Sequence, residues 1–198
     1  MNLNQVILAE GKKVNQNTTE HNHRFYTIQT RILAEVTVFV ALATALSFII
    51  VYTLPQGGSI TAGSMVPLIW LALRRGPKIG LAAGVIYGLI QFAVLPYIAP
   101  TPYAAIQVLL DYPLAFGVLG LAGYFKKLPL IGASVAIAVR FVMHFVSGVV
   151  YWAPVYAPDL NPFIYSAVYN GSYLLPELVV SAIIIYVLQK SKALNVYL

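Results

Sequence analysis

The sequence lacks cysteine and has little charge. None of its 198 residues is cysteine, and only six are acidic. The absence of cysteine excludes disulfide bonds, thiolate metal sites and thiol catalysis. Charged residues make up 9% of the chain and hydrophobic residues 60%, and the mean hydropathy is +0.80. This composition excludes a water-soluble globular domain and indicates an integral protein of a lipid bilayer.

The apolar residues occur in runs of about 20, and the short alternating segments of an outer-membrane barrel are missing. Helices satisfy the backbone hydrogen bonds of such runs inside lipid. The sequence therefore predicts an all-α integral membrane protein with six transmembrane helices, the second of them short. These helices are expected over 32–52, 60–73, 79–97, 105–125, 130–150 and 163–188.

The basic residues are distributed unevenly between the two sides of the predicted helices. Eleven of the twelve Lys and Arg residues lie before the first helix or after the second, fourth and sixth. The opposite loops, 54–59, 98–104 and 153–162, contain none. By the positive-inside rule both termini are cytoplasmic, so the net charge of +6 reflects topology rather than nucleic-acid binding. We expect a polar tail over 1–30 and a single transmembrane domain over 31–198.

Three polar side chains that lipid should exclude lie at a similar depth in three predicted helices. At about 1.5 Å per residue, Asp111, His144 and Asn170 each lie roughly 10 Å below the outer surface. Intramembrane polar groups are costly and are usually functional. A carboxylate beneath aromatic faces suits a flat, cationic or hydrogen-bonding ligand. The alternative is an interfacial aromatic belt above polar groups that satisfy one another. The nearby aromatic residues are Tyr112, Tyr151, Trp152 and Tyr165.

Two charged residues lie deeper in the last two predicted helices. Arg140 and Glu177 are at equal depth, and a lone buried charge would be more costly than a pair. We therefore expect a structural ion pair between them at the floor of the site. A proton relay is the alternative role.

The sequence lacks the common catalytic motifs. A P-loop needs a glycine five residues before its Gly-Lys pair, but Val6 precedes Gly11 at that distance. There is one intramembrane aspartate rather than a dyad, and no His-Glu-x-x-His motif. A serine hydrolase that uses Ser147 or Ser172 with His144 stays open, although small residues in such helices more often serve packing. We expect no enzymatic activity, no metal and no cofactor.

Four segments within residues 31–190 carry specific motifs: GGSITAGSMVPLIWLALRRGPK, QVLLDYPLAFGVLGLAG, VRFVMHFVSGVVYW and NPFIYSAVYNGSYLLPE. Together they resemble the thiamine-specific S component of energy-coupling factor (ECF) transporters. The resemblance implies a multi-pass protein of the prokaryotic plasma membrane that captures thiamine with high affinity. It also implies partners that drive uptake, namely a transmembrane T component and two ATPase subunits.

The resemblance places the family's ligand-binding positions on residues of the same cluster. It implies an acidic and a tyrosine ligand, an imidazole, a close-contact glycine, a stacking tryptophan, a hydroxyl and an amide. These are, in that order, Asp111, Tyr112, His144, Gly148, Trp152, Tyr165 and Asn170.

The chain departs from some relatives at two of these places. Asp111 stands where they carry a glutamate, and residues 56–59, Gln-Gly-Gly-Ser, stand where they carry a loop tryptophan. We expect Tyr103 to substitute for the missing ring.

Small residues recur every four positions in the first predicted helix, at Thr37, Ala41 and Ala45. Such a stripe lets another helix approach closely. The resemblance implies that Thr37 and Ala41 dock the energising module, and packing within this chain is the alternative.

A second functional hypothesis is a self-sufficient proton-coupled vitamin carrier. Its relay would consist of Asp111, His144, Arg140 and Glu177. Uptake by the chain alone would distinguish this carrier from a partner-driven subunit.

Overall fold

The structure is a computed structural model that describes residues 29–191. The described residues belong to two compact units that divide between Thr37 and Val38. This boundary falls within the first described helix, Gln29–Ser47. Of the predicted polar tail, all but the last two residues lie outside the described part of the chain.

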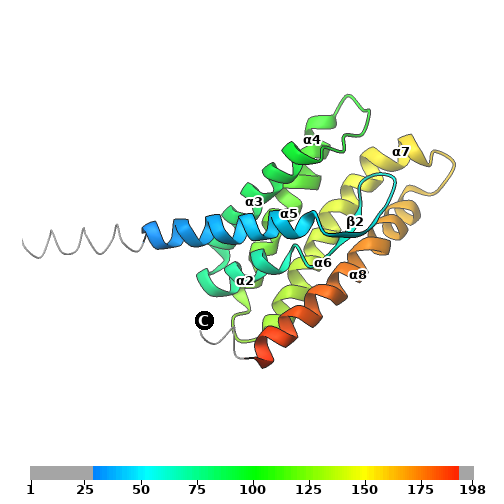
Figure 1. Ribbon diagram of the computed structural model, residues 1–198. Coiled ribbons are helices and arrows are strands. Elements are labelled where there is room, and N and C mark those ends of the chain that lie inside the picture. The colour runs from blue at the N-terminus through cyan, green and yellow to red at the C-terminus, as the bar shows by residue number, and fades with distance from the viewer. Residues whose placement is uncertain (1–28, 192–198) are drawn as a thin grey trace, which may run out of the picture. The chain divides into compact units, whose positions relative to one another are not determined.

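The second unit is built mainly of helices that join end to end. α4, η1, α5 and η2 form the continuous helix Ala104–Tyr124, and α6, η3 and α7 form the helix Pro129–Tyr156. Figure 1 shows α3, the Ala104–Tyr124 helix, α6 and α8 as neighbours in that order. The helical elements are α2 (Val66–Arg75), α3 (Pro77–Val94), α4 (Ala104–Leu109), η1 (Leu110–Leu114), α5 (Ala115–Gly117), η2 (Val118–Tyr124), α6 (Pro129–Ser147), η3 (Gly148–Trp152), α7 (Ala153–Tyr156) and α8 (Pro162–Lys190).

Five described helices are long and apolar enough to cross a membrane. The prediction of an all-α membrane protein is confirmed, with one long helix fewer than the six expected. The five are Gln29–Ser47, Pro77–Val94, Ala104–Tyr124, Pro129–Tyr156 and Pro162–Lys190.

The second predicted span, 60–73, was expected to be short, and the helix there, α2, has only ten residues, too few to be among the five. α2 packs against α3, η2, α6 and α8. Its buried residues are Val66, Pro67, Leu68, Ile69, Leu71, Ala72 and Leu73. Hydropathy alone does not distinguish a helix buried in protein from one that faces lipid.

A short hairpin precedes α2 where the ends of two spans were predicted. β1 (Ile50–Thr53) and β2 (Ser59–Thr61) pair antiparallel. β-branched residues dominate β1 and favour the extended backbone. Gly57, with φ of 89°, provides the left-handed conformation that the turn requires. The first membrane helix consequently ends at Ser47 instead of continuing to Tyr52.

A glycine stripe on α3 fixes the position of the helix that carries Asp111. Gly80, Gly84 and Gly88 recur every four residues and face that helix. A Cβ atom at Gly84 would meet the carbonyl oxygen of Phe116, and one at Gly88 would meet that of Tyr112. Close backbone approach of this kind is a common packing mode of membrane helices.

Gly84→Ala is expected to destabilise the protein by about 1–3 kcal/mol, because the added methyl group has no space and must displace the neighbouring backbone. Thermal unfolding in detergent measures the effect. Gly171→Ala is the matched control, since a Cβ atom there has no atom within 4 Å and alanine favours helix. Equal unfolding temperatures for the two variants would contradict this packing.

Candidate binding site

Two π-helical turns carry the main residues of the site. η1 contains Asp111 and Tyr112, and η3 contains Gly148 and Trp152. Pro113 lies inside η1 and has no N–H to donate, which favours a break in the regular hydrogen bonding. π turns change which side chains face inward and are frequent at functional sites.

The Asp111 carboxylate is the centre of a hydrogen-bond network. Its Oδ2 accepts from Gln107 Nε2 and Ser147 Oγ, each at 2.7 Å, and from Trp152 Nε1 at 2.9 Å. Its Oδ1 lies 2.9 Å from His144 Nδ1. Three of these four protein groups bond to Oδ2 and one to Oδ1. Asp111 therefore joins its own helix to the Pro129–Tyr156 helix.

His144 lies between Asp111 and Arg140. Arg140 Nε donates to His144 Nε2 at 3.3 Å, so Nε2 is an acceptor and the proton of a neutral ring is on Nδ1, facing Asp111. The Arg140 guanidinium also lies 4.1 Å from the centre of the Phe116 ring and donates to Met65 Sδ. The imidazole is thus held by one hydrogen bond at each nitrogen.

Tyr112 and Gln107 hold the loop that follows α3. The Tyr112 hydroxyl accepts from Tyr97 N at 2.6 Å and donates to Leu95 O at 3.0 Å. Gln107 is fully buried, accepts from Ala99 N and donates to Tyr97 O in addition to Asp111. The loop and the carboxylate are therefore positioned by the same helix.

Asn170 joins α8 to α6 on the other side of the site. Its Nδ2 donates to the carbonyl oxygen of His144 at 3.2 Å, and its Oδ1 accepts from the Tyr173 hydroxyl at 3.1 Å. Gly148 permits this contact, because a Cβ atom there would collide with Ser166 Oγ. Gly148 thus lets α8 pack closely on η3.

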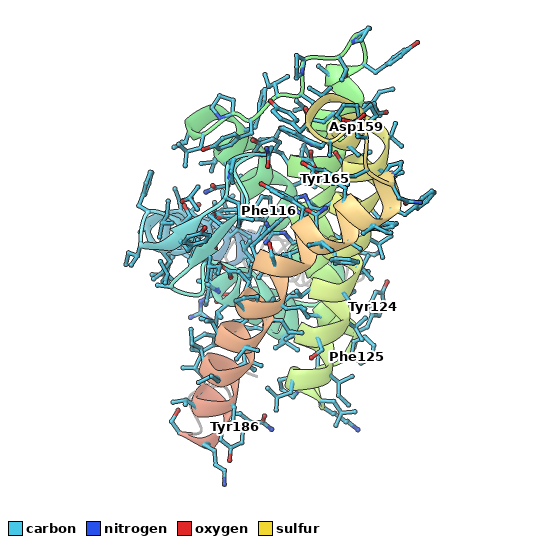
Figure 2. All side chains as sticks on the ribbon, turned by 90° about the vertical axis from the view of Figure 1, so that its right-hand side faces the viewer. Phe116, Tyr124, Phe125, Asp159, Tyr165 and Tyr186 are labelled. Carbon is cyan, nitrogen blue, oxygen red and sulfur yellow. The ribbon has the colours of Figure 1, made fainter. Side chains whose placement is uncertain are left out.

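Seven of the eight predicted ligand-binding residues line one cavity. The side chains of Asp111 and His144 are 12% and 11% exposed. Figure 2 shows Tyr165 toward one end of the helices and Tyr186 at the other, with Phe116 between them. The seven are Asp111, Tyr112, His144, Gly148, Trp152, Tyr165 and Asn170.

Stacked aromatic rings form the wall of this cavity. Tyr165 and Tyr169 stack with ring centres 5.9 Å apart, and Trp152 lies against Tyr156 at 5.7 Å. The Tyr169 hydroxyl accepts from Gly58 N at 3.1 Å and so fixes the hairpin turn to α8. The Tyr165 hydroxyl is buried and has no hydrogen-bond partner among residues 29–191.

The expectation that Tyr103 supplies the missing ring is wrong. Tyr103 is 65% exposed and does not line the cavity, because it lies in the loop before α4. Tyr97, Tyr169 and Tyr173 line the cavity beside the hairpin turn instead. Gly58 packs so closely that a Cβ atom there would lie 2.6 Å from Tyr173.

The direct ion pair expected between Arg140 and Glu177 is also wrong for the described side chains. Glu177 Oε1 is turned toward the hairpin and accepts from both the backbone N–H and the hydroxyl of Thr61. Arg140 is held by His144, Met65 and Phe116. Both residues line the cavity, but each charge has its own neighbours.

Sequence reasoning missed several residues of the site. Gln107 could have been found from its spacing, since it lies four residues before Asp111 on a helix. Tyr169 had no comparable signal, because tyrosine near a helix end also fits the interfacial belt. Ser147 was considered as a nucleophile, but its hydroxyl donates to Asp111 and not to His144. In the described part of the chain no three His, Cys, Asp or Glu residues cluster as metal ligands.

The helices and the cavity define the class of protein. Apolar helices of the second unit line a concave site of aromatic faces and fixed polar groups, as in a multi-pass membrane protein that binds a small molecule. The sequence profile of a family described as "Thiamine transporter protein" matches residues 33–196. The chain belongs to this thiamine transporter family, which is a family of transporters and not of enzymes.

Individual relatives agree with this assignment. The thiamine transporter ThiT of Bacillus subtilis is 33% identical over 175 residues, which cover 79% of this chain and 88% of that protein. ThiT of Lacticaseibacillus paracasei is 27% identical over 177 residues, covering 81% and 87%. A solved structure of ThiT from Listeria monocytogenes superimposes with a TM-score of 0.73 at 28% identity and covers 83% of this chain and 96% of that one.

Gln107→Leu is expected to lower the free energy of unfolding by about 1–3 kcal/mol, because it leaves Asp111 Oδ2, Ala99 N and Tyr97 O short of a partner. Thermal unfolding of the purified protein measures this change. Gln189→Leu serves as the control, since Gln189 is exposed near the end of α8. If Gln107→Leu and Gln189→Leu unfold at the same temperature, the hydrogen bonds of Gln107 do not stabilise the protein.

Proposed function

We propose that this protein binds thiamine with high affinity in the cavity around Asp111 and takes it up across the plasma membrane. The observation that carries the proposal is the cavity itself, in a chain of the thiamine transporter family. Its aromatic walls suit the pyrimidine and thiazolium rings, and its polar groups suit their edges and charge. The proposed ligand-binding residues are the seven predicted residues that line the cavity, and Tyr103 is no longer among them.

Calorimetric titration of the purified protein with thiamine tests this proposal. Riboflavin and biotin serve as control vitamins of different shape. Saturable binding of thiamine alone is expected. No heat of binding and no thermal stabilisation with thiamine would overturn the proposal.

We further propose that uptake needs an ECF energising module of a transmembrane T component and two ATPases. The sequence has no P-loop with which to bind ATP itself. Ala41 and Ala45 are exposed on the first membrane helix, which supports a docking stripe that continues to Thr37. The positive-inside rule supports cytoplasmic termini.

The alternative hypothesis, a self-sufficient proton-coupled carrier, does not require an energising module. It predicts that the chain alone takes up thiamine in liposomes and responds to a pH gradient. The subunit proposal predicts uptake only when the module and ATP are present. Full uptake by the chain alone would overturn the need for partners.

Trp152 is expected to report ligand binding through its fluorescence. The chain has two tryptophans, and Trp70 lies on α2 and does not line the cavity. Thiamine stacked near Trp152 should quench the emission. We expect Trp152→Phe to abolish the quench and Trp70→Phe, the control, to retain it. If thiamine still quenches the fluorescence of Trp152→Phe, Trp152 does not stack on the bound ligand.

Ala41→Trp and Thr37→Trp are expected to separate binding from transport. A large side chain on the stripe should block a partner helix without reaching the cavity, whose lining includes neither residue. Thiamine affinity should stay near that of the parent, while co-purification with the module and ATP-dependent uptake are lost. Leu42→Trp is the control, since Leu42 is exposed beside the stripe on the same helix. Normal transport by Ala41→Trp would refute the docking face.

A further inference from the structure

Three tyrosines recur every four residues on α8 and line the cavity, namely Tyr165, Tyr169 and Tyr173. Side chains four residues apart lie on the same face of a helix. The rings of Tyr165 and Tyr169 stack with an interplanar angle of 16°, and Tyr169 meets Tyr173 edge to face with ring centres 6.0 Å apart. The three rings therefore form one aromatic surface, and Tyr169 is its middle member.

The ring of Tyr169 is fixed in orientation and keeps accessible surface. The residue is half-buried and lines the cavity, whereas Tyr173 is only 5% exposed. The Tyr169 hydroxyl accepts from Gly58 N at 3.1 Å, and a neighbouring tyrosine ring lies on each side. A side chain held in this way loses little entropy when a ligand packs against it. Because its hydroxyl is directed to the hairpin turn, Tyr169 offers a ligand the face of its ring.

Gly58 of the hairpin turn makes room for these rings. A Cβ atom at this position would lie 2.6 Å from the Tyr173 ring and 3.2 Å from the Tyr169 hydroxyl oxygen. The turn therefore cannot place a large side chain here while both tyrosines keep their positions. Beside Gly58, the aromatic surface of the cavity comes from α8 instead.

The permanent positive charge of the cavity lining belongs to Arg140. Its guanidinium lies 4.1 Å from the centre of the Phe116 ring, and its Nε donates to His144 Nε2. This guanidinium repels a cationic ligand ring, whereas the electron-rich face of a tyrosine attracts one. The side of the cavity formed by the α8 tyrosines therefore suits a cation better than the side formed by Arg140.

Resting on the proposed function, we propose that the face of the Tyr169 ring binds the positively charged thiazolium ring of thiamine and contributes to selectivity for this cation. The thiazolium nitrogen carries no hydrogen to donate, so this ring is recognised through its charge and its faces. The pyrimidine ring, which has an amino group and ring nitrogens, needs the hydrogen-bonding groups of the cavity instead. Tyr169 thus adds an eighth residue to the proposed ligand-binding set.

Tyr169→Phe and Tyr169→Leu separate the aromatic face from the hydroxyl. Phenylalanine keeps the face and loses the hydrogen bond to Gly58, whereas leucine loses both. In calorimetric titration with thiamine, Tyr169→Phe is expected to stay within about threefold of the parent, and Tyr169→Leu is expected to lose about 5- to 30-fold in affinity. Tyr169→Met repeats the test with another flexible apolar side chain, so the comparison does not depend on the folding of one variant.

Tyr186→Leu is the matched control for these variants. Tyr186 lies on the same helix, is 49% exposed and does not line the cavity. This variant should bind thiamine with the affinity of the parent.

A neutral analogue of thiamine tests the role of the charge. It carries a thiophene ring in place of the thiazolium and keeps the pyrimidine and the hydroxyethyl arm. The loss of affinity caused by Tyr169→Leu should be at least about threefold smaller for this analogue than for thiamine, because the charge that the tyrosine face attracts is missing.

Three results would overturn the proposal. The first is a loss of thiamine affinity below about fivefold in folded Tyr169→Leu or Tyr169→Met. The second is an equal loss for thiamine and the neutral analogue. The third is a loss in Tyr169→Phe as large as in Tyr169→Leu, which would assign the effect to the hydrogen bond with Gly58. These results leave the proposed function intact, whereas a parent protein that binds no thiamine would overturn the proposed function and this inference together.

Discussion

The buried carboxylate of Asp111 is the constraint on which the site depends. An isolated carboxylate inside a membrane protein is costly, so its helix must be placed where enough donors reach it. Gln107 comes from the same helix, and His144, Ser147 and Trp152 come from the neighbouring one. Satisfying one charge thereby fixes the separation of two helices, the orientation of an imidazole and the edge of an indole ring.

The remaining walls are attached to this centre by close packing and by polar contacts. Glycines of α3 bring its backbone against η1, and Asn170 bonds to the backbone of α6 beside His144. The hairpin is attached differently. Every residue of β1 is exposed, so its position depends less on apolar burial than on hydrogen bonds from Gly58 and Thr61 to Tyr169 and Glu177 of α8.

The grouping of three polar residues could be predicted from the sequence, but the direction in which each side chain points from its helix axis could not. Counting residues from the helix ends placed Asp111, His144 and Asn170 together, and they do line one cavity. The same count placed Arg140 level with Glu177, yet the two side chains face different neighbours. The π turns at η1 and η3 change which side chains face inward; Pro113 favours the first of them, but no sequence motif predicts the second. The hydropathy of α2 predicted a short span but not its burial by other helices, because burial in protein and burial in lipid select the same residues.

A cavity whose polar groups are mostly satisfied by the protein has few hydrogen bonds left to offer. Asp111, Tyr112 and Asn170 each bond to other parts of the chain, and these hydrogen bonds hold the shape of the cavity. Such preorganisation lowers the entropy cost of binding. Two oxygens of the described cavity lining, at Tyr165 and Glu177, are buried without a hydrogen-bond partner. The aromatic faces of the cavity attract a flat cation more strongly than a neutral molecule of the same shape, so shape and charge act together in recognition.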